Sequence, residues 1–477
     1  MSKTVRVLSV VSECVPLLKT GGLADVAGAL PRALSIKGVD MRVLMPAYRK
    51  QRWRLDGMKV LFHEGDLFGG PATVYGGVVG GIEFLLLDAA HLYDREGGPY
   101  SGPWGEWEDN PQRFAALSWV AARIAREGLS DGWRPQILHC HDWQAGFAPA
   151  YLKWGGPTDV KSVITIHNIA FQGWAKAELL QELRLPSHEF HVQSLEYYGG
   201  LSSLKAALVT ADRITTVSPN YAIELMRPEY GMGLQGILAE RADVVSGILN
   251  GVDTQVWSPE AEEHAYSFDN LRGKIENRAT LCAAFDLEVP GPLAIVVSRM
   301  TDQKGIDLLP EVLPEFIEAG GGVAILGSGE PELENAMRAL EVRYPDRVGV
   351  RVGYDEGLSH LMFSGGDAVL VPSRFEPCGL TQMYGLRYGT LPVVAQVGGL
   401  ADSVITVNPA SMIAGAATGF TFSPTTADAF AGALRRLVQL WHEPSHWAQV
   451  QRNAMRHPVG WEASADEYAT LYAELVQ

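Results

Sequence analysis

The junction between the first strand and the first helix constrains the fold of this chain more than any other feature. The apolar residues 5–11 predict a buried strand, and the apolar spacing of residues 24–34 predicts a helix. Between them stand Lys19, Gly21 and Gly22. Glycines at such a turn let backbone N–H groups approach an anion, and the following helix adds its positive dipole end. The junction is therefore typical of an α/β fold with a phosphate-binding loop, although glycines that serve only the turn remain an alternative.

The glycine spacing narrows the kind of anion site. It matches neither the spaced-glycine dinucleotide fingerprint nor the P-loop, which ends in Lys followed by Ser or Thr. Neither an NAD-dependent enzyme nor a kinase is therefore predicted. Lys19 favours the phosphate interpretation, because it places a cation beside the loop.

Strands and helices alternate along the chain in two series that a polar stretch at 258–269 separates. Strands are predicted at 5–11, 41–45, 83–87, 136–140, 162–166, 213–217 and 244–249, and then at 293–298, 323–326, 348–352, 368–371, 391–395 and 403–406. This alternation predicts parallel sheets covered on both faces. We expect an α/β fold of two doubly wound, Rossmann-like domains that face a cleft. The first would span 1–255 and the second 256–456, with a C-terminal helix at 457–477 crossing back to the first domain.

Length and charge limit the classes of partner. The chain has 477 residues, of which 47% are hydrophobic, and domains average roughly 150 residues, so two or three domains are expected. The 39 basic and 55 acidic residues give a net charge of −16. This balance disfavours nucleic acid or an anionic membrane as the main partner. An anionic ligand must therefore be met by local cations.

The cysteines and the first residues indicate a cytoplasmic protein. The four cysteines, at 14, 140, 282 and 378, form no CxxC pair and no closely spaced framework, which is typical of reduced thiols in the cytosol. The first strand follows the N-terminus too closely for a signal-peptide core. No stretch reaches the roughly 18–20 apolar residues of a membrane span.

Polar side chains stand at the ends of two strands of the first series. His141 and Asp142 follow one strand, and His167 follows the next. The cluster around His141 suggests a metal site, but adjacent strand residues face opposite sides of a sheet, and Asp142 before a helical run is a natural N-cap. We therefore expect no metal site. His167 is better placed for a functional role, with a structurally bonded histidine as the alternative.

Two segments of the second series combine cations, glycines and a carboxylate. Arg299 and Lys304 follow one strand and precede Gly305, and two cations beside a helix start suit a diphosphate. After another strand, a proline-fixed turn with Glu376 leads to Gly379 and a helix. This order would direct a carboxylate and backbone N–H groups at one point, where they suit sugar hydroxyls. A charge that merely favours the helix dipole is the alternative for Glu376.

These motifs resemble those of the bacterial glycogen synthase family, which is related to the plant starch synthases. The similarity extends over nearly the whole chain and rests on residues 12–13, 19–26, 141–143, 167–173, 215–219, 248–253, 298–305, 372–382 and 398–402. Ser203 and Gln235 depart from the residues usual in the family, but they lie outside the expected donor site.

The resemblance implies a retaining glycosyltransferase with the two-domain GT-B fold. It would transfer glucose from ADP-glucose to the non-reducing 4-hydroxyl of an α-1,4-glucan such as glycogen, with no cofactor and no metal. Another retaining GT-B glycosyltransferase, of the sucrose or cell-wall type, is one alternative. A non-catalytic glucan-binding relative, suggested by the aromatic segment 104–107, is another.

The resemblance also assigns roles to individual residues. It implies Glu376, Arg299, Lys304 and His167 as the catalytic groups, with the two cations at the diphosphate and the other two at the glucose. The substrate-binding residues that it implies are Lys19, Gly21, Gly22, Asp25, Asp142, Asn250, Tyr354, Cys378, Gly379, Leu380 and Thr381. Among these, Tyr354 would stack on the nucleotide base.

The chemistry of the implied reaction agrees with this set of residues. Breaking the bond to the diphosphate builds positive charge on the sugar and negative charge on the leaving group, so preorganised cations and dipoles are the useful groups. No protein base is evident, and the leaving phosphate would take the acceptor proton. A covalent glucosyl-enzyme would need a carboxylate below the anomeric carbon, a position that the sequence does not assign to Glu376. Because Lys19 and Lys304 belong to different domains, we also expect the domains to close around the donor.

Overall fold

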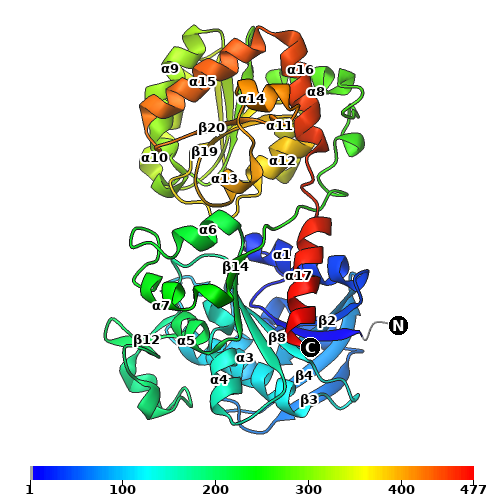
Figure 1. Ribbon diagram of the computed structural model, residues 1–477, viewed down its shortest axis with the longest axis vertical. Coiled ribbons are helices and arrows are strands. Elements are labelled where there is room, and N and C mark those ends of the chain that lie inside the picture. The colour runs from blue at the N-terminus through cyan, green and yellow to red at the C-terminus, as the bar shows by residue number, and fades with distance from the viewer. Residues whose placement is uncertain (1–3) are drawn as a thin grey trace. The chain divides into compact units, whose positions relative to one another are not determined.

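The computed structural model describes residues 4–477 (Figure 1). Residues 1–3, with which the expected first domain begins, lie outside the described range. Contacts divide the chain into two compact units. Unit 1 comprises Met1–Leu249 and Trp461–Gln477, and unit 2 comprises Asn250–Gly460. No helix within residues 4–477 is long and apolar enough to cross a membrane.

Unit 1 is built on a nine-stranded sheet in the order β14-β13-β9-β8-β1-β2-β5-β4-β3. Its strands are β1 (Val5–Val10), β2 (Val39–Pro46), β3 (Lys59–Glu64), β4 (Ala72–Val79), β5 (Ile82–Asp88), β8 (Ile137–His141), β9 (Lys161–Ile166), β13 (Arg213–Thr216) and β14 (Val245–Gly247). The short strands β6 (Ser101–Gly102), β7 (Gly105–Glu106), β10 (Trp174–Lys176), β11 (Glu196–Tyr197) and β12 (Gly200–Ser202) form two small sheets beside it. The large sheet is parallel except where β4 pairs with β3 and β5.

The helices of unit 1 pack around this sheet. They are α1 (Gly22–Ser35), α2 (Ala90–Tyr93), α3 (Asn110–Glu127), α4 (Phe147–Trp154), α5 (Ser203–Thr210), α6 (Pro219–Glu224), α7 (Gln235–Glu240) and α17 (Trp461–Leu475). The central strand β8 is buried along its whole length. A parallel strand covered on both faces has no solvent side, so most of its residues are apolar.

Helix α17 ends the chain but belongs to the core of unit 1. Figure 1 shows it in red beside α1, and Trp461, Tyr468 and Tyr472 share a buried cluster with Leu30 and Leu34 of α1. The hydroxyl of Tyr472 is also hydrogen-bonded to His139 in β8, 333 positions earlier. The last helix therefore closes one face of the first sheet.

Unit 2 has a six-stranded parallel sheet in the order β17-β16-β15-β18-β19-β20. Its strands are β15 (Leu293–Val297), β16 (Gly322–Gly327), β17 (Val348–Val352), β18 (Ala368–Val371), β19 (Leu391–Ala395) and β20 (Phe420–Phe422). Its helices are α8 (Arg272–Ala284), α9 (Leu309–Glu318), α10 (Pro331–Arg343), α11 (Glu356–Gly365), α12 (Thr381–Tyr388), α13 (Gly398–Ser403), α14 (Pro409–Ile413), α15 (Ala427–Trp441) and α16 (Pro444–Arg456). In strand sequence this order is 3-2-1-4-5-6, the doubly wound arrangement.

Each sheet has one point at which the strand order reverses direction. It lies between β1 and β8 in unit 1 and between β15 and β18 in unit 2. Loops at the carboxyl ends of the two strands diverge there, which leaves room for a ligand. Lys304 and Glu376 of unit 2 and Asp142 of unit 1 follow strands beside these reversal points, whereas Tyr354 follows the edge strand β17.

Two details of the sequence-based prediction were wrong. The strand expected at 403–406 does not form, because Ser403 ends α13 and Thr406 makes only an isolated bridge to Gly419. The sixth strand of unit 2 is instead β20. The antiparallel strands β3 and β4 were missed, because Gly76 and Gly77 interrupt the alternation of β4.

Candidate functional site

The reversal point of unit 2 brings together a lysine and a glutamate from two loops. Lys304 follows β15 in a short 3-10 turn, and Glu376 follows β18. The Nζ atom of Lys304 lies 2.6 Å from Oε2 of Glu376, and their side chains are 17% and 11% exposed. An ion pair shielded from water in this way holds both groups in fixed positions.

Neighbouring side chains fix the Glu376 segment. The Ser373 hydroxyl donates to Oε2 of Glu376 at 2.9 Å, and Nε2 of Gln303 donates to a main-chain carbonyl of the same segment at 3.1 Å. The guanidinium of Arg374 forms a two-point ion pair with Asp307 at 2.6 and 2.7 Å. The loop after β15 and the loop after β18 are thus bound to each other.

Gly398 and Gly399, at the start of the 398–402 motif, allow a close approach to the backbone of the Glu376 loop. A Cβ at Gly398 would lie 1.9 Å from the Glu376 carbonyl oxygen, and a Cβ at Gly399 would lie 2.2 Å from that of Cys378. The N–H of Gly399 donates to the Glu376 carbonyl at 3.1 Å. Only residues without a side chain let the start of α13 press against the Glu376 loop.

The first turn of α12 presents backbone donors beside this loop. Gly379 has a φ of +73°, and the chain then enters the helix at Leu380, which contributes no side-chain cap. The leading N–H groups from Thr381 onward therefore have no capping side chain, which suits an anion or a hydroxyl oxygen.

Asn250, which follows β14, lies next to Cys378 of the Glu376 loop. Its side chain is buried, and its Oδ1 has no hydrogen-bond partner within the described chain. Burial raises the pKa of the Cys378 thiol to about 12, although hydrogen bonds from Asn250 lower it. A thiol that stays neutral is no nucleophile at neutral pH, so its backbone is the part available for binding.

Arg299 and Tyr354 follow β15 and β17 of the same sheet, and both side chains are exposed. The Arg299 side chain is exposed and forms no ion pair with any residue in 4–477. Tyr354 is 79% exposed, and its hydroxyl donates to Glu356 at 3.2 Å. Both side chains are therefore accessible from solvent.

In unit 1, a carboxylate already occupies part of the predicted phosphate loop. Oε2 of Glu13 accepts the Thr20 hydroxyl at 2.6 Å, the Thr20 N–H, and the Gly21 N–H at 3.3 Å. Burial raises the pKa of Glu13, although these bonds lower it. The amide of Gly21, expected to face the substrate, is therefore bonded to Glu13. Residues 12–13 belong to a segment that resembles the family, but their spacing does not predict that Glu13 bonds to Thr20 and Gly21.

The other residues of this loop lie at its surface. Lys19 pairs with Asp25 at 2.9 Å, with side chains 47% and 32% exposed. Gly22 is exposed, and a Cβ there would meet nothing within 4 Å. Lys19, Asp25 and Gly22 thus remain accessible from solvent.

Asp142 holds the backbone of His167 instead of capping a helix. Its Oδ1 accepts the N–H of His167 at 2.7 Å and that of Asn168 at 3.3 Å. The 3-10 turn after Asp142 receives no side-chain cap, so the expected N-cap was wrong. Burial raises the pKa of Asp142 to about 7.

The histidines of this region bond to one another and to hydroxyl groups. Nδ1 of His141 lies 3.0 Å from Nε2 of His167, and His139 contacts Tyr472 and Thr165, each at 2.7 Å. Burial lowers the pKa of His139 and of His167 to about 3. Within residues 4–477 no group of three His, Cys, Asp or Glu side chains is placed to hold a metal ion.

Two hollows differ in what they offer. One of about 960 Å³ in unit 1 is lined by aromatic and polar side chains, including Trp107, Trp143, Phe171, Trp174 and Tyr197. Phe171 and Trp174 are 58% and 51% exposed there.

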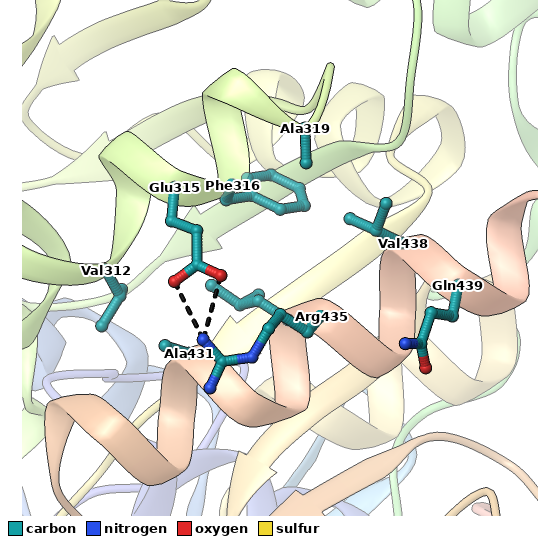
Figure 2. A pocket seen from close by; sticks show the side chains of 9 residues that line it. Val312, Glu315, Phe316, Ala319, Ala431, Arg435, Val438 and Gln439 are labelled. Atoms are coloured by element: carbon teal, nitrogen blue, oxygen red, sulfur yellow. Dashed lines mark hydrogen bonds and ion pairs between the residues drawn. The ribbon is translucent and has the colours of Figure 1, made fainter.

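The other hollow, of about 230 Å³, lies between α9 and α15 of unit 2 (Figure 2). Its walls are mainly apolar, and Figure 2 shows that its carboxylate, Glu315, is paired with Arg435 at 2.9 Å. This hollow lies between two helices and not at the carboxyl ends of the strands, where the candidate residues lie.

Comparison with protein families divides the chain along similar lines. Residues 6–240 match the family model of the starch synthase catalytic domain. Residues 283–454 match that of glycosyl transferases group 1.

Comparison with individual proteins covers almost the full length. The chain is 71% identical over 471 residues to the glycogen synthase of Cereibacter sphaeroides (strain ATCC 17025), which spans 99% of this chain and 98% of that protein. It is 55% identical over 469 residues to the glycogen synthase of Paracoccus denitrificans, which spans 98% of each.

Solved structures share the fold. The catalytic domain of starch synthase IV from Arabidopsis thaliana, bound to ADP and acarbose, superposes with a TM-score of 0.84 at 29% identity over 100% of both chains. The sucrose-phosphate synthase of Thermosynechococcus elongatus gives a TM-score of 0.60 at 17% identity over 99% of each chain, which establishes likeness of fold alone. The fold is GT-B, with two Rossmann-like α/β units.

Proposed function

Because this chain belongs to the bacterial glycogen synthase family, we propose that it transfers glucose from ADP-glucose to the non-reducing end of an α-1,4-glucan and thereby elongates glycogen. It is a hexosyltransferase of the GT-B class. The proposed transfer retains the anomeric configuration. The observation that carries the proposal is the shielded Lys304–Glu376 pair, with its 2.6 Å contact at the reversal point of a doubly wound sheet.

The donor interacts chiefly with unit 2. Lys304 and the exposed Arg299 neutralise the diphosphate and stabilise its charge as it leaves. Glu376 binds hydroxyls of the glucose, together with the backbone of Cys378, Gly379, Leu380 and Thr381 and the unpaired Oδ1 of Asn250. Tyr354, exposed after β17, stacks on the base.

Unit 1 contributes the groups that complete the reaction. Lys19 and Asp25, with Gly22, belong to the loop that serves the donor, and Glu13 keeps that loop in shape through Thr20 and Gly21. His167 contacts the glucose, and Asp142 holds its backbone.

The glucan acceptor uses the aromatic hollow of unit 1. Sugar rings present apolar faces to aromatic side chains and hydroxyls to polar ones, and this hollow carries both kinds of side chain. Its exposed Phe171 and Trp174 would support the faces of the glucan chain.

The reaction needs no metal, because lysine and arginine side chains supply the positive charge that a divalent ion would otherwise bring. The enzyme works in the cytoplasm, where its free cysteines would stay reduced.

The test is a transfer assay with purified protein, glycogen and either ADP-glucose or UDP-glucose, following nucleotide release. Digestion of the elongated chains by an α-1,4-specific hydrolase reports linkage and anomeric configuration together. Release of ADP with growth of α-1,4-linked chains is expected. Exclusive use of another acceptor, or products of inverted configuration, would contradict the proposal.

A further inference from the structure

The ring of His167 is held by a partner to which no role has been assigned, His141. Nδ1 of His141 lies 3.0 Å from Nε2 of His167, and Nε2 of His141 lies 3.2 Å from the hydroxyl oxygen of Ser9. Ser9 is in β1, His141 ends β8, and His167 follows β9, so three adjacent strands supply the chain of contacts. Ser9 and His141 are fully buried.

Hydrogen-bond accounting fixes the direction of this chain. The Ser9 hydroxyl makes no other hydrogen bond, to side chain or main chain, within residues 4–477, so its proton has one acceptor available, Nε2 of His141. A buried donor left without an acceptor is costly, whereas a spare lone pair is tolerated. Ser9 therefore donates to Nε2 of His141, and the His141 proton resides on Nδ1. His141 then donates to Nε2 of His167, so the His167 proton resides on Nδ1.

Nδ1 of His167, at the end of this series of hydrogen bonds, is available to a ligand. Nδ1 of His167 has no hydrogen-bond partner within residues 4–477, and the residue is half-buried. We propose that His141, oriented by Ser9, is a positioning residue that fixes the ring and the tautomer of His167, so that His167 presents an N–H donor to a sugar oxygen. The ligand in this inference rests on the proposed function, whereas the tautomer does not.

The groups around His141 and His167 agree with uncharged histidine rings. The ring of His139 lies 4.2 Å from that of His141, and its own nitrogens are taken by Tyr472 of α17 and Thr165 of β9. Asp142 contacts the main chain of His167. Burial lowers the pKa of His141 and of His167, so both rings are neutral at neutral pH and each carries one N–H. A doubly protonated His167 would set two N–H donors against each other at the 3.0 Å contact.

The test uses two substitutions of His141, each of which keeps a nitrogen near the position of one of the two ring nitrogens. His141→Asn retains an amide nitrogen near the position of Nδ1, facing His167, whereas His141→Gln extends its amide toward the position of Nε2, facing Ser9. We expect His141→Gln to lower kcat by roughly 10–100-fold, as loss of an orienting partner does, and His141→Asn to stay within about threefold of wild type. Thermal unfolding of both variants identifies any loss of fold.

Nitrogen-15 NMR of histidine-labelled wild-type protein supplies a readout that does not depend on activity. We expect the His167 proton on Nδ1, and its partial redistribution to Nε2 in Ser9→Ala. A proton on Nε2 of wild-type His167, or equal losses of activity in the two His141 variants, would overturn the inference. Absence of glucosyl transfer by the wild type would contradict the proposed function, and the NMR measurement would still decide the role of His141.

Discussion

At the scale of single residues, the function depends on charges held in fixed positions by close neighbours. The carboxylate of Glu376 is bonded to Lys304 at 2.6 Å and to Ser373 at 2.9 Å. Groups that are already oriented need no reorganisation when the diphosphate leaves, which is the main source of electrostatic catalysis.

Substitution of Lys304 tests whether its charge replaces a metal ion. Lys304→Ala should lower kcat by about 100-fold or more, the scale of one lost electrostatic contact. Lys304→Arg should recover only part of the rate, because a planar guanidinium does not reproduce a compact ammonium. Both effects and the wild-type rate should be unchanged by excess chelator in a nucleotide-release assay. Loss of activity with chelator, restored by added Mg²⁺, would disprove the cation-only account.

Asp142 should make stability depend on pH. Burial raises the pKa of Asp142 from its ordinary value of 3.8 to about 7, so between these pH values the folded state binds more protons than the unfolded state. The free energy of unfolding contributed by Asp142 therefore falls as pH rises from about 4 to 7. Asp142→Asn cannot titrate and keeps an oxygen for the two N–H donors. It should gain stability over wild type as pH rises, on the order of 3 kcal/mol.

Urea unfolding at pH 4.5 and at pH 8 measures this difference. The matched control is Asp159→Asn, since Asp159 is exposed and its ion pair with Arg134 lowers its pKa. The control should show no gain with rising pH. A stability difference for Asp142→Asn that is the same at both pH values would contradict the assignment.

Residue spacing singled out the candidate side chains of unit 2, but it did not predict how they meet. Arg299, Lys304 and Glu376 stand out because cations, glycines and a carboxylate follow apolar strands. The contact between Lys304 and Glu376 spans 72 positions, and no local pattern encodes it. Ser9 and Glu13 were missed for the same reason: each acts through a partner that the sheet brings close.

At the scale of secondary-structure elements, parallel strands were predictable because burial on both faces makes them continuous apolar runs. The bounds predicted for β17, β18 and β19 are those of the structure. β3 is exposed along much of its length, β4 is interrupted by glycines and β20 has only 3 residues, so none of the three carries this signal and all were missed.

Helix α17 should stabilise unit 1 through the polar contact that it makes with β8. The buried Tyr472 hydroxyl is hydrogen-bonded to Nδ1 of His139 at 2.7 Å. Tyr472→Phe leaves a buried ring nitrogen unpaired, so thermal and urea unfolding should show a loss of about 1–3 kcal/mol. Tyr344→Phe is the control, because its half-buried hydroxyl bonds to no residue of the described chain. Equal stability of the two variants would mean that apolar packing alone holds α17.

At the scale of the whole molecule, we propose that the donor binds chiefly to groups of unit 2 and that the glucan binds in the hollow of unit 1. The cations, Glu376 and the start of α12 belong to unit 2, whereas the aromatic hollow belongs to unit 1. This division gives separable effects on the donor and the acceptor.

Removal of the exposed aromatic rings should affect the acceptor alone. Phe171→Ala and Trp174→Ala should raise the KM for glycogen by roughly tenfold, since stacking on one ring contributes about 1 kcal/mol or more, with the KM for ADP-glucose changed by less than about twofold. Exposed Trp53, which does not line this hollow, provides the control Trp53→Ala. Equal changes in both KM values would place the hollow outside acceptor binding.

The central claim is that Glu376 acts on the donor sugar during transfer, and the turnover of Glu376→Gln tests it most directly. The amide keeps the size and one oxygen of the side chain but removes its charge. With saturating ADP-glucose and glycogen, kcat should fall by about 100-fold or more, while the matched variant Glu315→Gln, which alters an exposed ion pair of the same unit, should retain wild-type turnover. A Glu376→Gln enzyme that folds normally and turns over within a few-fold of wild type would contradict the account.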